Sequence, residues 1–187
     1  MDSFKTKNKK IEMQLVDQIR KGDHQAFEQL FFDYFFSLCS YAFQITQSND
    51  RAKDIVQEVF YKIWKHRHKW NIHTSLKAYL FRVVRNEALN QINKIKQQEQ
   101  VKEEVSAEGQ LPYPQERRQK TESEKKKIRA IWEIAQQMSQ RRRSVFVLHR
   151  KHGLSYKEIA KVLDISRKTV ENHMGLALEE IRKKLDC

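Results

Sequence analysis

Apolar residues recur every three or four positions along much of this chain of 187 residues. The first long stretch places on one helical face Phe27, Leu30, Phe31, Tyr34, Leu38, Tyr41, Ala42 and Ile45. A second stretch, which follows Ser48, Asn49 and Asp50, repeats the spacing at Ala52, Ile55, Val56, Val59, Phe60 and Ile63. A side chain in 48–50 can cap the second helix, so the pattern predicts two amphipathic helices.

The second of these helices has a polar face that includes an acidic patch. This face consists of Asp54, Gln57, Glu58, Tyr61 and Lys65. Asp54 and Glu58 are four positions apart and are therefore neighbours on the helix surface. Two acidic residues occur on many solvated faces, which is the plain interpretation of this patch. The alternative, in a basic protein, is a docking site for a basic partner surface.

Residues 66–75 are polar, show no periodicity and predict a loop. A third helix follows, capped by Thr74 or Ser75, with an inner face of Leu76, Leu80, Val83, Val84, Ala88, Ile92 and Ile95. Outside that face lie Lys77, Phe81, Arg82, Arg85, Asn86, Asn90, Asn93 and Lys94. Cations hold phosphates while amides and exposed rings engage unstacked bases, so this surface suits single-stranded nucleic acid. The alternative is that Phe81 and Trp70 belong to the core.

The C-terminal part predicts two more helices and then a helix-turn-helix. One inner face holds Ile128, Ile131, Trp132, Ile134 or Ala135, and Met138, and another begins at Val145, Phe146 and Leu148. Further on, Ser155 and Glu158 have the spacing of a capping box, and Ser166 can cap a second helix after a three-residue turn. The angle between the two helices would bury Ile159, Leu163, Ile165 and Val170, with small Ala160 allowing a close approach.

The second helix of this motif, from Arg167 to about Leu185, is expected to enter a DNA major groove with its first residues at the base edges. Its N-terminal end carries side chains that can pair with bases, namely Ser166, Arg167, Lys168, Thr169, Glu171, Asn172 and His173. Arg141, Arg142, Arg143 and Lys157 suit phosphates, which position a protein without specifying sequence. A helical hairpin that binds no DNA is the alternative interpretation.

Composition supports an all-α fold and a polyanionic partner. The chain has only 4 Gly and 2 Pro, and its formal net charge is +13. Residues 1–97 hold 17 basic and 10 acidic side chains, residues 98–124 hold 4 and 7, and residues 125–187 hold 16 and 7. Two basic modules joined by a mildly acidic connector therefore favour nucleic acid as the partner over plain solubility. The expected organisation is two small helical domains, 1–97 and 125–187, joined by a flexible linker at 98–124.

Several classes of protein are disfavoured. The most apolar stretch, 31–43, is too short to span a membrane, and no export signal is visible, so we expect a cytoplasmic protein without direct membrane insertion. Cys39 and Cys187 are too few and too far apart for a disulfide framework. His66, His68 and His73 lack a partner ligand at metal spacing, and no motif for a cofactor or for catalysis occurs. The sequence thus predicts no metal, no cofactor and no enzyme activity.

Four segments resemble a bacterial extracytoplasmic-function sigma factor, the group-four branch of the sigma-70 family. They are Gly22 to Phe27 with the aromatic helix after it, Asp54 to Trp64, Leu76 to Asn86, and Leu154 to Leu178. Their order and spacing cover nearly the whole chain. One departure is Asp164 at the turn position often filled by Gly, where Asp can adopt the left-handed conformation at some cost.

The resemblance implies roles for these segments. Members bind core RNA polymerase, through its beta-prime and beta subunits, and direct it to promoter DNA. By resemblance, the polymerase would bind at Asp54, Gln57, Glu58 and Tyr61. The minus-ten element, with one base extruded from the duplex, would contact Trp70, Asn71, His73, Thr74, Ser75, Arg82, Arg85 and Asn86. The helix after Ser166 would read the minus-thirty-five element, and an anti-sigma factor is a probable further partner.

Two other classes of protein compete with this interpretation. A dimeric helix-turn-helix regulator of the response-regulator type would explain residues 154–174 equally well, but its receiver domain needs alternating strands and helices. A nucleic-acid enzyme would need a cluster of metal-binding carboxylates or a nucleophile with a base. The helical pattern of residues 1–97 disfavours the first, and the absence of such motifs disfavours the second.

Overall fold

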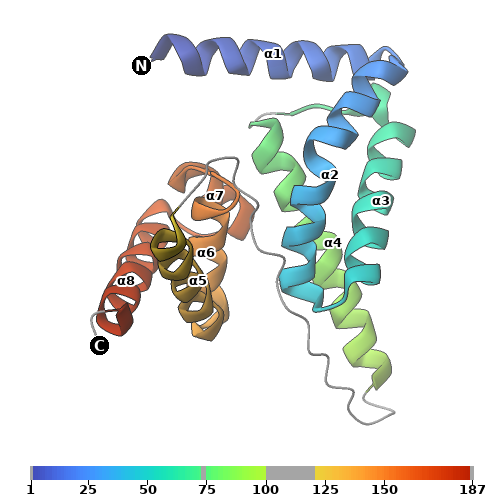
Figure 1. Cartoon of the computed structure of the whole chain (residues 1–187). Helices are drawn as coiled ribbons and strands as arrows, with labels where there is room; N and C mark the ends of the chain where they lie inside the picture. The colour runs from blue at the N-terminus through green and yellow to red at the C-terminus, as the bar shows by residue number, and fades with distance from the viewer. Residues whose placement is uncertain (1, 73–74, 100–120, 186–187) are drawn as a thin grey trace. The chain divides into compact units, whose positions relative to one another are not determined.

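The computed structural model describes residues 2–72, 75–99 and 121–185, and the regular structure within these ranges is helical throughout. The described residues form eight α-helices and one short 3-10 helix, which divide into two compact units, 1–112 and 113–187 (Figure 1). The all-α, two-domain expectation is confirmed. No strand occurs in the described part of the first unit, so nothing there resembles the receiver domain that the regulator alternative requires.

The N-terminal unit is built around three packed helices. Its elements are α1 (Asp2–Arg20), α2 (His24–Thr46), α3 (Asn49–Lys65), the 3-10 helix η1 (Arg67–Lys69) and α4 (Leu76–Glu99). Helices α2, α3 and α4 each pack on the other two, and α1 packs on α2 and η1 (Figure 1). The Asp23 and Ser48 side chains accept hydrogen bonds from Ala26 N–H and Arg51 N–H, which fixes the starts of α2 and α3.

Aromatic rings join α2 to α3 in this unit. The centroid of the Phe27 ring lies 4.8 Å from that of Trp64, and the Phe31 and Phe60 centroids are 5.0 Å apart. Leu30 and Ile55 are fully buried beneath them. The three-and-four spacing of apolar residues therefore forms the predicted core between α2 and α3, because rings and aliphatic side chains on the two facing stripes interdigitate.

The C-terminal unit places one long helix against three shorter ones. Its elements are α5 (Glu122–Gln137), α6 (Gln140–Arg150), α7 (Tyr156–Leu163) and α8 (Arg167–Leu185), and α8 packs on the other three. The capping box at Ser155 and Glu158 is present as predicted. Asp164 ends α7 in the left-handed conformation, with φ 55° and ψ 52°, and thus makes the turn that usually needs glycine.

The boundaries of the predicted connector at 98–124 are wrong at both ends. Helix α4 continues to Glu99, and α5 begins at Glu122, where the Thr121 and Glu124 side chains form a second capping box. The prediction rested on charge, on Pro112, Pro114 and Gly109, and on the lack of periodic apolar spacing, none of which marks a helix start as a capping box does by satisfying two free N–H groups. The prolines of the connector lie outside the described residues. The sequence pattern also did not predict α1 or η1.

Candidate nucleic-acid interface

The outward face of α3 carries the predicted acidic patch. Asp54, Gln57 and Tyr61 are exposed, whereas Glu58 is half-buried. The Glu58 carboxylate lies 3.4 Å from Lys62 Nζ, which also donates a hydrogen bond to Glu87 of α4 at 3.0 Å. The bond to Glu87 raises the pKa of Lys62 above its usual range. The Glu58 carboxylate is therefore already paired with a lysine, while Asp54 makes no ion pair within the described residues.

The predicted loop after α3 holds a short helical turn. Arg67 of η1 donates a hydrogen bond to the Trp64 carbonyl at 2.9 Å, and its guanidinium lies 4.5 Å from the centroid of the Trp64 ring. Trp70 follows, and its side chain is only 5% exposed. Its indole packs inward, with its ring centroid 5.9 Å from that of Tyr79, and the minus-ten contact that the resemblance implies for Trp70 stays a prediction. The alternative that Trp70 belongs to the core is confirmed.

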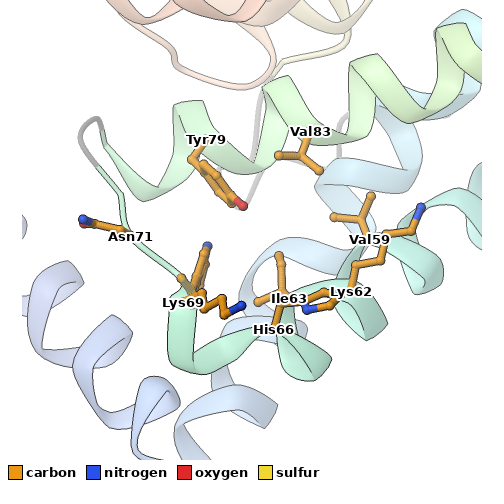
Figure 2. A pocket seen from close by; sticks show the side chains of 9 residues that line it. Val59, Lys62, Ile63, His66, Lys69, Asn71, Tyr79 and Val83 are labelled. Carbon is orange, nitrogen blue, oxygen red and sulfur yellow. The ribbon is translucent and has the colours of Figure 1, made fainter.

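A cavity of about 270 Å³ opens beside this loop, between α3 and α4. Figure 2 shows side chains from both helices and from the loop around it. Its lining consists of Val59, Lys62, Ile63, His66, Lys69, Trp70, Asn71, Tyr79 and Val83. Trp70 Nε1 is buried and has no hydrogen-bond partner among the described residues, so within them the lining includes one unused donor. The cavity combines apolar walls with lysine, amide and hydroxyl groups, which suits a small planar polar ligand.

Helix α4 positions the predicted cationic and amide surface. Ser75 Oγ accepts a hydrogen bond from Ala78 N–H at 3.2 Å, which confirms Ser75 as a cap. Arg82 and Asn86 are exposed and lie one turn apart, and Asn86 follows Val83 of the cavity by three residues. His73 and Thr74, also predicted to contact DNA, lie outside the described residues.

Two residues of α4 face the core more than predicted. Phe81 is fully buried, and its ring centroid lies 5.2 Å from that of Tyr41, so the expected exposed ring is wrong. Helix α4 packs on both α2 and α3, which widens its buried stripe beyond a single row. Burial raises the pKa of Tyr41, and the nearby positive charge of Arg85 opposes that rise. Arg85 is thus half-buried beside the core, unlike Arg82.

The helix-turn-helix presents the predicted recognition residues at the start of α8. Arg167, Lys168 and Asn172 are exposed. Arg167 Nε lies 3.0 Å from Glu171 Oε1, with 71% and 36% of the two side chains exposed. The other predicted contacts are Ser166, which is exposed, and Thr169, Glu171 and His173, which are half-buried. Ser166 Oγ accepts the Thr169 N–H at 3.0 Å, as the sequence predicted for a cap.

The four predicted phosphate contacts differ in availability. Arg141 and Lys157 are exposed and Arg143 is half-buried. Arg142 instead donates to Glu180 of α8 at 2.5 Å and lowers the pKa of that carboxyl. This ion pair links α6 to α8, so Arg142 is already engaged, and its predicted phosphate contact stays a prediction.

Several residues of the site were not predicted from the sequence. Lys62, His66, Lys69 and Tyr79 line the cavity, and the first three approach it from the end of α3 and from η1. The available signal was the spacing of Lys62 and His66, which are four positions apart at the end of α3 and so lie on one helical side, whereas Lys69 lies in η1.

The described residues give no sign of nucleophilic or metal chemistry. Burial raises the pKa of the Cys39 thiol to about 11, against which the charge of Lys53 acts, so the reactive thiolate is scarce at neutral pH. Within the described ranges, no three His, Cys, Asp or Glu side chains gather as a metal site would require. No helix in these same ranges is both long enough and apolar enough to cross a bilayer.

The fold and its surfaces define a two-domain helical protein with a helix-turn-helix and a second cationic surface. Residues 34–98 match the family description Sigma-70 region 2, and residues 128–181 match Sigma-70, region 4. Thus the chain belongs to the sigma-70 family of RNA polymerase sigma factors, in its extracytoplasmic-function group. Such a factor directs promoter-specific initiation of transcription, which is the function of this chain.

Individual relatives agree with this assignment. The chain is similar to the RNA polymerase sigma-H factor of Pseudomonas aeruginosa, at 24% identity over 93% of each chain. It is also similar to the extracytoplasmic-function RNA polymerase sigma factor SigW of Bacillus subtilis, at 26% identity over 91% of this chain and 94% of that protein. The fold resembles that of the sigma factor RpoE, solved in complex with the anti-sigma factor NepR from Bartonella quintana. The TM-score is 0.66 at 22% identity, over 86% of this chain and 96% of RpoE.

Proposed function

We propose that this sigma factor divides its work among three surfaces. The face of α3 with Asp54, Gln57, Glu58 and Tyr61 binds core RNA polymerase through a basic surface of the beta-prime subunit. The loop and α4 take the minus-ten element as it opens, and the start of α8 reads the minus-thirty-five element as duplex. The beta subunit completes the contact with core polymerase.

The main support for this proposal is that, in the N-terminal unit, the acidic patch and the cationic surface lie on different helices. Asp54 is exposed on α3 with no ion pair among the described residues, whereas Arg82 and Asn86 are exposed on α4. A basic protein surface and a DNA strand can therefore bind the same unit without competing for one face. The support is strongest for Asp54, Arg82 and Asn86, which are exposed, and weakest for Arg85.

The cavity beside the loop provides a place for an extruded base. Extrusion of a base costs a few kcal/mol, which stacking and hydrogen bonds in a pocket offset. Asn71 and Tyr79 lie at the cavity, and Asn86 lies one turn beyond it. In this proposal Trp70 forms part of the cavity wall and does not stack on the bases of the DNA strand.

The proposed function is tested by transcription in vitro with core polymerase and the full-length protein. We expect transcripts from defined start sites only when both proteins are present, with permanganate-reactive bases near the minus-ten element. Promoter sequences come from sequencing the DNA that copurifies with the complex. Tight sequence-specific DNA binding without polymerase, together with no initiation, would contradict the proposal.

Recognition by α8 makes a specific prediction about Arg167. An Arg167→Ala variant is expected to lose about 1–3 kcal/mol of discrimination at a single base pair, because a bidentate contact from arginine to guanine is lost. The measurement is competition binding of promoter variants by the assembled complex. Arg182→Ala, at the exposed far end of the same helix, is the matched control. An equal loss on all sequences would make Arg167 a phosphate contact.

The remaining features of the proposal follow from the same family membership. The chain itself catalyses no reaction, since the polymerase supplies the chemistry, and it acts in the cytoplasm where DNA and polymerase are found. An anti-sigma factor is proposed as a regulator, because the fold is similar to that of a sigma factor solved with such a partner.

A further inference from the structure

The start of α4 is capped by a residue from a distant part of the chain. Glu12 Oε2, on α1, accepts a hydrogen bond from the Leu76 backbone N–H at 3.2 Å. The first N–H groups of a helix have no partner within the helix, and a negative charge there is stabilised by the helix dipole. Ser75 satisfies Ala78 N–H, so Glu12 and Ser75 each hold one of these donors.

Helix α1 also reaches the other end of the loop. It packs against η1, and the turn after α1 places Gly22 beside the Arg67 side chain. Helix α1 and the turn after it thus contact the chain on both sides of the lining residues Trp70 and Asn71, near Arg67 and at Leu76. The Leu76 side chain is itself 2% exposed, so the chain enters α4 at a buried point.

We propose that Glu12 is a positioning residue that holds the first turn of α4, which carries Tyr79 to the cavity, and thereby sets the base preference of the cavity. Glu12 does not touch DNA in this proposal, which rests on the proposed function of the cavity. When the Glu12 carboxylate is removed, the Leu76 N–H loses this partner, and the start of α4, three residues before Tyr79, gains freedom. A binding site depends on such preorganisation, because its contacting groups must be held near their productive geometry by packing and neighbouring hydrogen bonds.

The test compares base discrimination across the minus-ten element for the full-length protein bound to core polymerase. Initiation is measured on promoter variants that carry each base at each position. Glu12→Ala is expected to reduce discrimination at one minus-ten position about tenfold, while preferences at the minus-thirty-five element stay unchanged. Glu12→Gln, which keeps an acceptor oxygen, is expected to retain most of the discrimination.

Controls separate positioning from general loss of stability. Gln14→Ala changes an exposed side chain on the same helix and should have no effect. If Glu12→Ala fails to bind core polymerase, Glu12→Asp takes its place, because it keeps the charge but withdraws the oxygen by one methylene group. Unchanged discrimination in the variant used, or an equal loss at every promoter position, would overturn the proposal.

Failure of this inference can be told apart from failure of the proposed DNA site. Asn86→Ala is measured in the same assay. If Asn86→Ala loses minus-ten discrimination and Glu12→Ala does not, only the positioning role is wrong. If neither variant changes it, the cavity and α4 do not read the minus-ten element, and both proposals fail.

Discussion

A double charge reversal, Asp54→Lys with Glu58→Lys, is expected to weaken binding to core RNA polymerase at least a hundredfold. Like charges brought together at an interface cost several kcal/mol, and each 1.4 kcal/mol is a factor of ten in affinity. The measurement is copurification with core polymerase, followed by titration of labelled protein. Far-ultraviolet circular dichroism checks that the helices remain.

The two positions should not contribute equally. Glu58 already lies 3.4 Å from Lys62 Nζ, whereas Asp54 makes no ion pair within the described chain. Asp54→Lys alone is therefore expected to account for most of the loss. Glu133→Lys, which makes the same charge change at an exposed site of the C-terminal unit, is the matched control. Full retention of core binding by the double variant would refute the docking face.

The second large effect is expected from Asn86→Ala. This change should slow open-complex formation on duplex promoters about tenfold or more, because the side chain that holds the extruded base is lost while extrusion still costs a few kcal/mol. Permanganate footprinting over time measures the rate. Core affinity should stay within a factor of two, since Asn86 lies on α4 and not on the α3 face.

Two comparisons make this result specific. Gln97→Ala removes another exposed amide from α4, three turns further along and outside the predicted nucleic-acid surface, and should open promoters normally. On a promoter that is already mismatched over the minus-ten element, Asn86→Ala should regain part of the rate of open-complex formation. The protein then no longer has to supply the free energy that unpairs these bases. Normal opening of duplex DNA by Asn86→Ala would show that its amide holds no base.

Local sequence signals predicted the helices and their starts well. Ser48, Ser75, Ser155 and Ser166 cap helices as expected, and the helix-turn-helix spans the predicted residues. Each of these signals acts over one turn of helix, where side-chain chemistry and the backbone N–H groups are close in sequence. The left-handed residue at Asp164 belongs to the same class of local feature.

Features that depend on long-range packing were predicted poorly. Trp70 lies in a segment without periodicity, so nothing in the sequence indicated which way its ring faces. Phe81 is buried because α4 contacts two neighbouring helices, a property of the assembled unit and not of the α4 sequence. The Glu12 contact joins positions 64 apart in the chain. Such contacts are fixed by tertiary structure, which helical spacing does not encode.

The ion pair at the start of α8 determines how easily Arg167 becomes available to a DNA duplex. Arg167 and Glu171 meet at 3.0 Å while largely open to solvent, and an exposed pair of this kind is worth less than about 1 kcal/mol. The pair therefore holds the guanidinium only loosely, and its release when DNA binds costs little. A G·C pair offers the guanine acceptors to Arg167 and the cytosine amino donor to Glu171. Both side chains can therefore exchange their mutual ion pair for hydrogen bonds to one base pair.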